Sequence, residues 1–268
     1  MPILRSIKTL LVSNGLGPVV EYVKYALKTV QYASDNRNFK NANPNLKLPP
    51  PYMLFEAYGM SYRRYFEKGR ETAEGILKQF KPYLPKEGPI VLDWGCGPAR
   101  LTRHIAEFLP FSGSVRGTDY NPKTIEWCKR ALPDIEFKLC QLSPPLPYES
   151  SSTDAIISIS IFTHLSEKLH DEWLAELSRI LNSGGVLFVT THGDCYREIL
   201  TASQKELYEQ GELVIQEFEQ EGHRLFAAFQ PPDAFRALFG QYFIERHFHP
   251  GKVESWGRQQ DMWLLQKK

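Results

Sequence analysis

Between residues 89 and 192 the chain alternates short apolar runs with amphipathic stretches, and this alternation constrains the fold more than any other feature. Strands are predicted at residues 89–95, 113–120, 135–142, 153–161 and 186–192. Helices are predicted between most of them, at residues 99–109, 122–132 and 168–181. Strands that alternate with helices are typical of a parallel sheet covered by helices on both faces.

The flanks of this core follow different patterns. Apolar residues recur at helical spacing over residues 3–11 and 18–33, and another helix is predicted over residues 61–80. The asparagine-rich and proline-rich stretch at residues 34–51 is expected to be a loop or linker. After the core, residues 194–240 break the alternation and contain a predicted hairpin at 213–230. Two further strands are predicted at residues 242–249 and 260–267.

Composition narrows the function classes. Lys and Arg total 32 against 31 Asp and Glu, so the chain lacks the basic surplus of a general nucleic-acid binder. Its four cysteines are far apart and form no CxxC pair, which indicates a reducing cytoplasm and neither a disulfide framework nor a metal site. The apolar N-terminal stretch is too short to span a membrane, so no stable membrane insertion is expected. A docked surface helix is favoured there over a membrane-surface or partner-binding helix.

The sequence LDWGCGPAR, residues 92–100, ends the first predicted strand in a glycine-rich turn. Glycines at such a turn let the backbone approach a ligand closely. A dinucleotide site needs a third glycine where Arg100 stands, and Asp93 would repel a pyrophosphate. Asp93 suits the ammonium of a cationic ligand, although it could instead stabilise the N-terminus of the following helix.

A second carboxylate, Asp119, stands at the end of the next predicted strand, where it can accept hydrogen bonds from both hydroxyls of a ribose. Capping of the turn before Asn121 and Pro122 is the alternative. Asp93, Gly95, Gly97 and Asp119 together indicate a ligand with a ribose and an ammonium but no phosphates. S-adenosylmethionine fits that description.

Over residues 89–192 the chain resembles the class I S-adenosylmethionine-dependent methyltransferases. The resemblance rests on LDWGCGPAR, on Asp119, on Cys140-Gln141-Leu142, on LPYESSSTDAIISISIFTHL and on ELSRILNSGGVLFVTTHG. Two positions depart from the usual pattern: Ala99 replaces a third glycine, and Cys140 and Gln141 stand where many members carry Asp or Asn near the adenine. The resemblance implies S-adenosylmethionine as cofactor, bound by Asp93, Gly95, Cys96, Gly97, Asp119, Tyr120, Gln141, Leu142 and Ser160.

The resemblance also implies an α/β fold, a Rossmann-like three-layer sandwich. Its seven-stranded sheet would be mostly parallel with an antiparallel last strand, and a helical extension would precede it. We expect N-terminal helices and a linker at residues 1–51 and the methyltransferase domain at residues 52–268. Residues 194–240 would form an insertion on the acceptor side. The N-terminal helices could be a homodimer surface or a packed cap.

A methyl acceptor with a hydroxyl group benefits from a general base, and histidine suits that role near neutral pH. His164 and His192 follow the fourth and fifth predicted strands and are the candidate catalytic residues; hydrogen bonding to a loop or helix is the alternative for both. His104, His170 and His223 are expected at the surface. The candidates for the acceptor pocket are Tyr58, Tyr62, Phe162, His249 and Trp256, although core packing would equally explain Tyr62 and Phe162.

The sequence therefore predicts a methyltransferase that acts on a small molecule, at a hydroxyl oxygen of a natural product or sugar-like compound. The fourth predicted strand ends in SISIF and lacks the NPPY-type signature of amide or adenine methylation. Two alternatives stay open: a methyltransferase-like protein that binds without catalysis, and a nicotinamide-dependent oxidoreductase.

Overall fold

The structure is a computed structural model that describes residues 17–217, 219–223, 225–255 and 257–268. Close contacts between Cα atoms divide the chain into two compact units, with the division between Gly69 and Arg70. In the described part of the chain, the first unit is helical and the second contains the strands. Each unit is described below by itself.

The first unit contains α2 (Gly17–Ala42), α3 (Pro51–Ala57) and the beginning of α4 (Tyr62–Phe80). Its small core consists of Phe39, Leu54, Tyr62 and Tyr65. The predicted end of the second helix near residue 33 is wrong, because α2 continues to Ala42. Residues 34–42 lack an apolar period, but tertiary contacts keep them helical: Phe39 is buried, and the Asn36 amide bonds the backbone of Met60 and Tyr62.

The second unit is built on a seven-stranded sheet in the order β3-β2-β1-β4-β5-β11-β8. The strands are β1 (Ile90–Trp94), β2 (Ser114–Asp119), β3 (Glu136–Leu139), β4 (Thr153–Ser158), β5 (Leu181–Thr191), β8 (Phe243–His249) and β11 (Asp261–Lys267). The first five pair in parallel, whereas β11 runs antiparallel to both β5 and β8. The last strand of the chain is therefore inserted between its two neighbours. The predicted α/β sandwich with an antiparallel last strand is confirmed.

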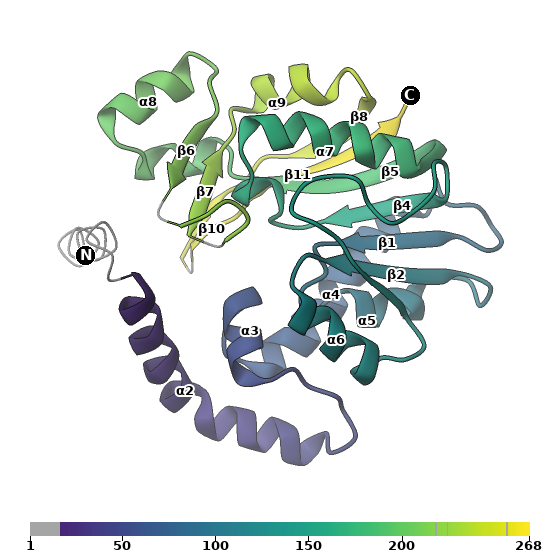
Figure 1. Ribbon diagram of the computed structural model, residues 1–268, viewed down its shortest axis with the longest axis vertical. Coiled ribbons are helices and arrows are strands. Elements are labelled where there is room, and N and C mark those ends of the chain that lie inside the picture. Colours follow the sequence, from purple (N-terminus) through teal and green to yellow (C-terminus); the bar gives the residue numbers. More distant parts are fainter. Residues whose placement is uncertain (1–16, 218, 224, 256) are drawn as a thin grey trace. The chain divides into compact units, whose positions relative to one another are not determined.

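Helices cover both faces of this sheet, as alternating side chains of the strands require. On one face, Leu92 and Ile156 pack with Trp173 of α7 (Glu167–Ile180) and Phe235 of α9 (Pro232–Phe239). Val91, Ala155 and Phe188 point to the other face, against α4 and α5 (Thr102–Ile105). In Figure 1, α7 crosses in front of the sheet and α5 lies behind it. The short helix α6 (Pro122–Ala131) packs beside β3.

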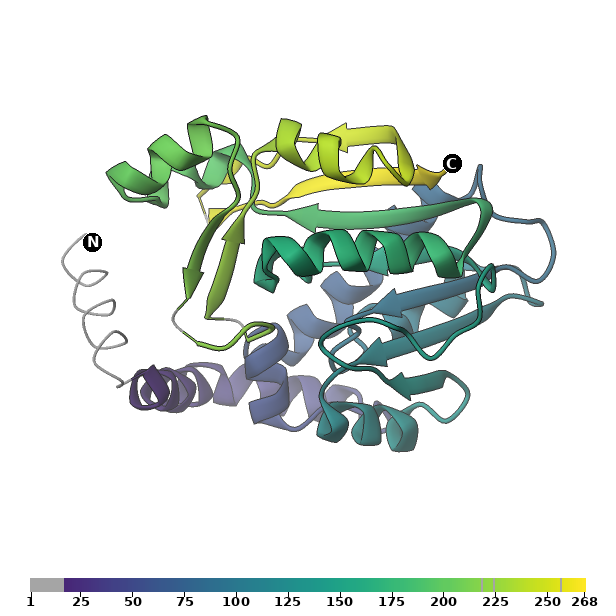
Figure 2. The same ribbon diagram turned by 45° about the horizontal axis from the view of Figure 1, so that its top comes forward.

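Residues 194–230 form a small substructure after β5. It contains a 3-10 helix (Asp194–Ile199), α8 (Ala202–Glu209) and an antiparallel hairpin of β6 (Val214–Glu217) and β7 (Phe226–Phe229). The predicted hairpin is thus confirmed. Figure 2 shows it running across the carboxyl-terminal edge of the sheet. A short ribbon of β9 (Val253–Glu254) and β10 (Gly257–Arg258) connects β8 to β11.

Candidate functional site

The loop after β1 adopts a backbone conformation that favours glycine at two positions. Gly95 and Gly97 have φ angles of 73° and 50°, in the left-handed region that favours glycine. The backbone N–H groups of Gly95 and Cys96 both donate to the Thr118 carbonyl, at 2.8 and 2.9 Å. The loop is therefore fixed against the end of β2, beside Asp119.

Asp119 is oriented by backbone donors. Its Oδ2 accepts from Gly97 N–H at 3.0 Å, and its Oδ1 accepts from Asn121 N–H at 2.8 Å. Burial raises the pKa of this carboxyl, while the two backbone donors oppose the rise. Because a carboxylate oxygen can accept two hydrogen bonds, each oxygen retains capacity for a ligand hydroxyl. The predicted turn-capping role and a ribose-binding role are thus compatible here.

Asp93 lies deeper than Asp119. It is 2% exposed, and its Oδ2 accepts from the Thr102 hydroxyl at 2.6 Å, at the first residue of α5. Burial raises the pKa of its carboxyl to about 6, while the Thr102 hydrogen bond opposes the rise. The contact to Thr102 is the helix N-terminal arrangement that the sequence left open as an alternative. Contact of Asp93 with a ligand ammonium stays a prediction.

A cavity of about 60 Å³ opens beside the loop, at the carboxyl ends of β1, β2 and β4. It is lined by Trp94, Gly95, Asp119, Tyr120, Cys140, Gln141, Leu142, Ile161, His164, Leu165, Trp173 and Gly222. Five of the residues predicted to bind cofactor are among them: Gly95, Asp119, Tyr120, Gln141 and Leu142.

Four residues predicted for the cofactor do not line this cavity. Asp93 is 2% exposed, whereas Gly97 is partly exposed and its N–H donates to Asp119. Cys96 is buried in the cluster that packs α6 against β3, and its thiol donates to the Gly97 carbonyl at 3.4 Å. Ser160 belongs to a separate polar cluster described below. For these four residues, a role in binding stays a prediction.

Sequence reasoning missed the aromatic wall of the cavity. The rings of Trp94 and Trp173 lie 4.4 Å apart between centroids, and the Trp173 indole N–H donates to the Leu142 carbonyl at 3.0 Å. Trp94 was visible in the sequence, since it immediately precedes Gly95. Nothing local indicated Trp173, which reaches the cavity because α7 packs over the sheet.

The tip of the β6–β7 hairpin covers part of the same cavity. Gly222 N–H donates to the His164 carbonyl at 2.9 Å, and the Tyr120 hydroxyl donates to the Gly222 carbonyl at 3.1 Å. The Glu221 carboxylate accepts from Ser166 N–H. The hairpin tip therefore contacts the segments that follow β2 and β4 at the cavity mouth, and Gly222 lies 102 residues after Tyr120 in sequence.

The two candidate catalytic histidines differ in which ring nitrogen is engaged. His164 Nδ1 lies 2.7 Å from the Phe226 carbonyl and must carry the proton that it donates; no partner of Nε2 occurs among the described residues. His192 Nδ1 lies 3.2 Å from the Ala228 carbonyl, and its Nε2 lies 3.3 Å from the Gln260 amide nitrogen. Burial lowers the pKa of both rings, that of His192 to about 3. Of the two, only His164 lines the cavity.

Gln260, which the sequence did not single out, organises a polar cluster at the ends of β4 and β5. Its Oε1 accepts from the hydroxyls of Ser160, at 2.9 Å, and Thr190, at 2.6 Å. These two donors fix the amide so that its nitrogen points at His192 Nε2. No sequence pattern could have found this group, because Gln260 is brought there by the antiparallel insertion of β11.

The expectation that His104, His170 and His223 lie at the surface is wrong for two of them. His104 and His170 are each 1% exposed. His104 Nδ1 pairs with Glu107, and His170 lies between the Phe162 carbonyl and the Gln230 side chain. Their helices supply a buried face at these positions, which the sequence pattern alone did not separate from the exposed face.

The acceptor-pocket candidates are scattered. Phe162 is 1% exposed and packs against Trp94 and Phe235, and His249 is exposed at the end of β8. Tyr58 and Tyr62 belong to the first compact unit, where the buried Tyr62 hydroxyl donates to the Pro49 carbonyl. Trp256 lies outside the described residues. A shared pocket for these residues stays a prediction.

No three His, Cys, Asp or Glu side chains of the described part of the chain are grouped so as to hold a metal ion. No described helix is both long enough and apolar enough to cross a membrane.

Comparison with known proteins tests the interpretation of the loop. Residues 91–185 match the model of the methyltransferase domain family. The chain carries a class I S-adenosylmethionine-dependent methyltransferase domain. The prediction of this family, with S-adenosylmethionine as its cofactor, is thereby confirmed and the oxidoreductase alternative is disfavoured.

Relatives of this domain are methyltransferases by name. An uncharacterised methyltransferase of Geobacillus thermodenitrificans is 30% identical over 140 residues, 51% of this chain and 62% of the relative. A trans-aconitate 2-methyltransferase of Variovorax paradoxus is 28% identical over 128 residues, 48% of this chain and 47% of the relative. The chain thus spans about half to three-fifths of these relatives.

A solved structure extends the likeness in fold. The 1,6-didemethyltoxoflavin-N1-methyltransferase of Burkholderia thailandensis, solved with its acceptor and S-adenosylhomocysteine, has a TM-score of 0.54 and 14% sequence identity. The match covers 82% of this chain and 92% of that one. At this identity the likeness concerns the fold of the methyltransferase domain alone.

Proposed function

We propose that the protein transfers the methyl group of S-adenosylmethionine to a hydroxyl oxygen of a small natural product or sugar-like acceptor. One observation carries this proposal: the Asp119 carboxylate, fixed by backbone donors, and the open Nε2 of His164 line the same cavity. The Asp119 carboxylate can accept hydrogen bonds from the ribose of the methyl donor, and His164 Nε2 can accept the hydroxyl proton of the methyl acceptor. A net charge of +1 favours a small molecule over a nucleic acid as acceptor.

The proposed reaction is a displacement at the methyl carbon of the sulfonium. The bond from methyl to sulfur breaks, the bond from methyl to the acceptor oxygen forms, and the hydroxyl proton passes to His164 Nε2. Positioning supplies much of the rate in such a displacement, and a base adds roughly 10²–10⁴-fold. The Phe226 carbonyl favours this role because it holds the proton on Nδ1 and leaves Nε2 as an acceptor. His192, engaged at both nitrogens, would first have to release Gln260.

The acceptor class depends on residues outside the shared domain. The relatives named above act, by name, on trans-aconitate and on N1 of a didemethyltoxoflavin, so family membership leaves the acceptor open. We propose that residues 194–240 contribute acceptor contacts. Contact of Gly222 with Tyr120 and His164 supports this proposal. The expected domain boundary between residues 51 and 52 stays a prediction; the compact units of the structure divide after Gly69.

The first experiment is calorimetric titration with S-adenosylmethionine, S-adenosylhomocysteine and NADH. We expect saturable binding of the first two only, and for Asp119→Asn a loss of affinity of about tenfold or more, since one charged acceptor for the ribose is removed. Asp134→Asn, an exposed change of the same kind, is the matched control. Unchanged affinity of Asp119→Asn would refute the ribose assignment.

Catalysis is tested separately by measuring S-adenosylhomocysteine formation over a panel of hydroxylated acceptors. We expect His164→Gln to lower turnover roughly 10²-fold with donor affinity unchanged. Binding of the donor with no product from any acceptor would support the alternative of a protein that binds without catalysis.

We further propose that the protein works in the cytoplasm. All four cysteines are free thiols in the structure, and three of them are buried. Cys128 and Cys96 lie beside one another against the Gly97 carbonyl without a disulfide, as is usual in a reducing compartment.

A further inference from the structure

The helical unit contains a cavity that the methyltransferase domain does not account for. It has a volume of about 250 Å³, near the lower end of the range for small-molecule pockets, roughly 300 Å³. Every residue that lines it lies between Lys28 and Arg64, on α2, α3, the loop after α3 and the beginning of α4. The cavity can therefore be analysed within this unit alone.

The floor of the cavity is apolar and its backbone is accessible. Phe55 and Met60 are buried, at 8% and 4% exposure, and supply apolar surface. Gly59 lies between them in sequence with a φ of 140°, and a Cβ added there would meet no atom within 4 Å. A flat apolar group can thus lie directly against the Gly59 backbone without a side chain in the way.

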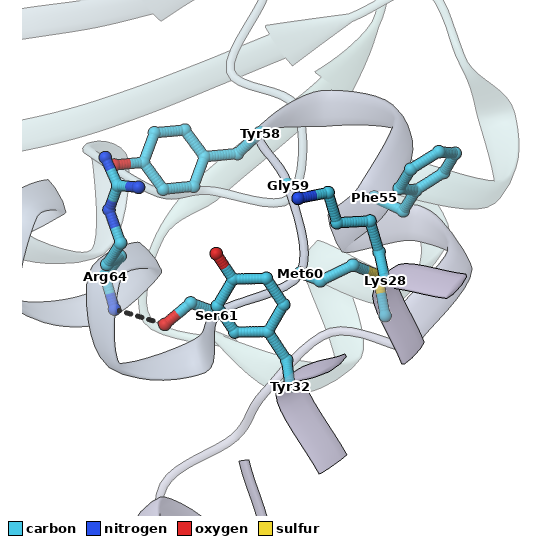
Figure 3. A pocket seen from close by; sticks show the side chains of 8 residues that line it. All are labelled: Lys28, Tyr32, Phe55, Tyr58, Gly59, Met60, Ser61 and Arg64. Carbon is cyan, nitrogen blue, oxygen red and sulfur yellow. Dashed lines mark hydrogen bonds between the residues drawn. The ribbon is translucent and has the colours of Figure 1, made fainter. Parts of the chain in front are cut away.

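The rim of the cavity is cationic. Figure 3 shows the Lys28 ammonium and the Tyr32 hydroxyl pointing into the space in front of Gly59, with Arg64 on the opposite side beside Tyr58. Among the residues that the structure describes, no acidic side chain lines the cavity. No carboxylate of the described residues forms an ion pair with Lys28 or Arg64. The Lys28 ammonium donates one hydrogen bond to the neutral Gln31 amide, at 3.0 Å. An ammonium has three N–H donors, so others remain for a ligand.

Neighbouring cations of the same helices behave differently. Lys24, one turn before Lys28, pairs with Glu21, and Arg63, adjacent to Arg64, pairs with Asp35 and Glu67. Of these four cations, Lys28 and Arg64 have no carboxylate partner among the described residues, and these two line the cavity. Two positive charges that converge on one space attract an anion, and an arginine guanidinium can bind a carboxylate or phosphate with two parallel hydrogen bonds.

We infer that this cavity is a binding site for a small organic anion, a carboxylate or phosphate attached to a flat apolar body. The anionic group would lie between Lys28 and Arg64, with the Tyr32 hydroxyl as a further donor. The apolar body would lie on Phe55, Met60 and the Gly59 backbone. The inference goes beyond the proposed methyl transfer and does not depend on it, because every residue involved belongs to the helical unit.

Calorimetric titration of the full chain, without methyl donor, tests the site with phenyl phosphate, benzoate, benzyl alcohol and inorganic phosphate. For at least one of the two aromatic anions we expect a dissociation constant on the order of 0.1–1 mM. Benzyl alcohol and inorganic phosphate should each bind at least about tenfold more weakly, because each lacks one half of the recognised chemistry. The tighter of the two aromatic anions identifies the anionic group as phosphate or carboxylate.

Substitutions locate the binding. Lys28→Gln combined with Arg64→Gln should weaken the tighter anion about tenfold or more, and Arg64→Lys should fall between this variant and the wild type. The matched control, Lys24→Gln with Arg63→Gln, removes the same charge from the same helices and should change binding less than about twofold. All four side chains are at least partly exposed, so we expect both double variants to fold, and thermal unfolding checks this.

Three results would overturn the inference: equal binding of benzyl alcohol, inorganic phosphate binding as tightly as phenyl phosphate, or equal losses in the two double variants. Asp119→Asn separates this inference from the proposed function. It should weaken donor binding about tenfold or more and leave the anion site intact.

Discussion

At the scale of single residues, close packing at the sheet edge makes one glycine indispensable. Asp261, at the start of β11, is 1% exposed, and its Oδ1 accepts from Gly251 N–H at 2.7 Å. A Cβ at Gly193 would lie 1.8 Å from Asp261 Oδ2. The φ of Gly193 is −96°, which other residues also adopt, so contact with Asp261, and not backbone strain, requires glycine there.

Gly193→Ala should therefore destabilise the protein, by roughly 1–3 kcal/mol, as overpacking of a well-filled site does. In an Asp261→Ala background the same change should cost less than about 1 kcal/mol, because the clashing carboxylate is gone. Urea unfolding of the four proteins measures this cycle. Additive costs in the cycle would show that the clash does not account for the need for glycine.

At the scale of elements, the β6–β7 hairpin restricts the cavity. Its volume of about 60 Å³ is well below the roughly 300 Å³ of ordinary ligand pockets, and the Ile161 side chain packs directly on the Gly95 backbone. Binding of a nucleoside-sized donor at this cavity therefore requires movement of the hairpin tip or of Ile161. The hydrogen bond from the Tyr120 hydroxyl to Gly222 holds the tip in place.

Tyr120→Phe removes that hydrogen bond and should speed association of S-adenosylmethionine about threefold or more, as the tip opens more readily. Stopped-flow tryptophan fluorescence can follow binding, since Trp94 and Trp173 line the cavity. Tyr22→Phe, an exposed change on α2, serves as control. An association rate equal to that of the wild type would mean that the tip does not limit entry.

A second element, α2, carries an exposed apolar row. Val19, Val23, Leu27 and Val30 are 50–78% exposed and recur at helical spacing. We propose this row as the homodimer surface expected from the sequence, although its N-terminal neighbour at residues 1–16 lies outside the described chain. Exposed apolar rows of this kind mark interaction sites more often than chance would give.

Val23→Asp combined with Leu27→Asp should convert a dimer into a monomer in sedimentation experiments, because two carboxylates would be buried at the interface. Lys24→Asp with Lys28→Asp, a change of the same kind on the polar positions, should dissociate the dimer much less. A monomeric wild-type protein at concentrations up to about 100 μM would reject the proposal.

At the scale of the whole molecule, buried titratable groups set opposing pH dependences. Burial lowers the pKa of His170 from 6.5 to about 4, so the unfolded chain binds this proton before the folded chain does. Its contribution to stability is complete above pH 6.5 and is lost as the pH falls toward 4. Asp93 and Asp261, with pKa values raised from 3.8 to about 6, act in the opposite sense. The folded chain takes up their protons first, so their contribution rises as the pH falls.

The contributions of His170 and of the two aspartates to stability change in opposite directions with pH. A substitution of His170 isolates the histidine contribution. The difference in unfolding free energy between the wild type and His170→Gln should shrink by about 2 kcal/mol from pH 7 to pH 5, since only the wild type loses the histidine contribution. Urea unfolding at both pH values measures it. His247→Gln, the same substitution at an exposed position of β8, is the matched control.

The sequence by itself determined the α/β alternation, the glycine turn after β1 and the position of Asp119 at the end of β2. These features are local, because the spacing of apolar residues and the glycines of a tight turn each involve only a few neighbouring residues. The antiparallel last strand was implied by the resemblance to a family and not by a local pattern.

Only the tertiary structure decided which polar groups meet. Gln260 reaches Ser160 and His192 because β11 inserts beside β5, and Gly222 reaches Tyr120 because the hairpin folds back over the sheet edge. The tertiary structure also distinguishes His164, whose Nε2 has no partner among the described residues, from His192. It places His104 and His170 in the interior. Such contacts join residues that lie tens of positions apart in the sequence. They depend on how whole helices and strands pack, and a local sequence pattern does not predict that packing.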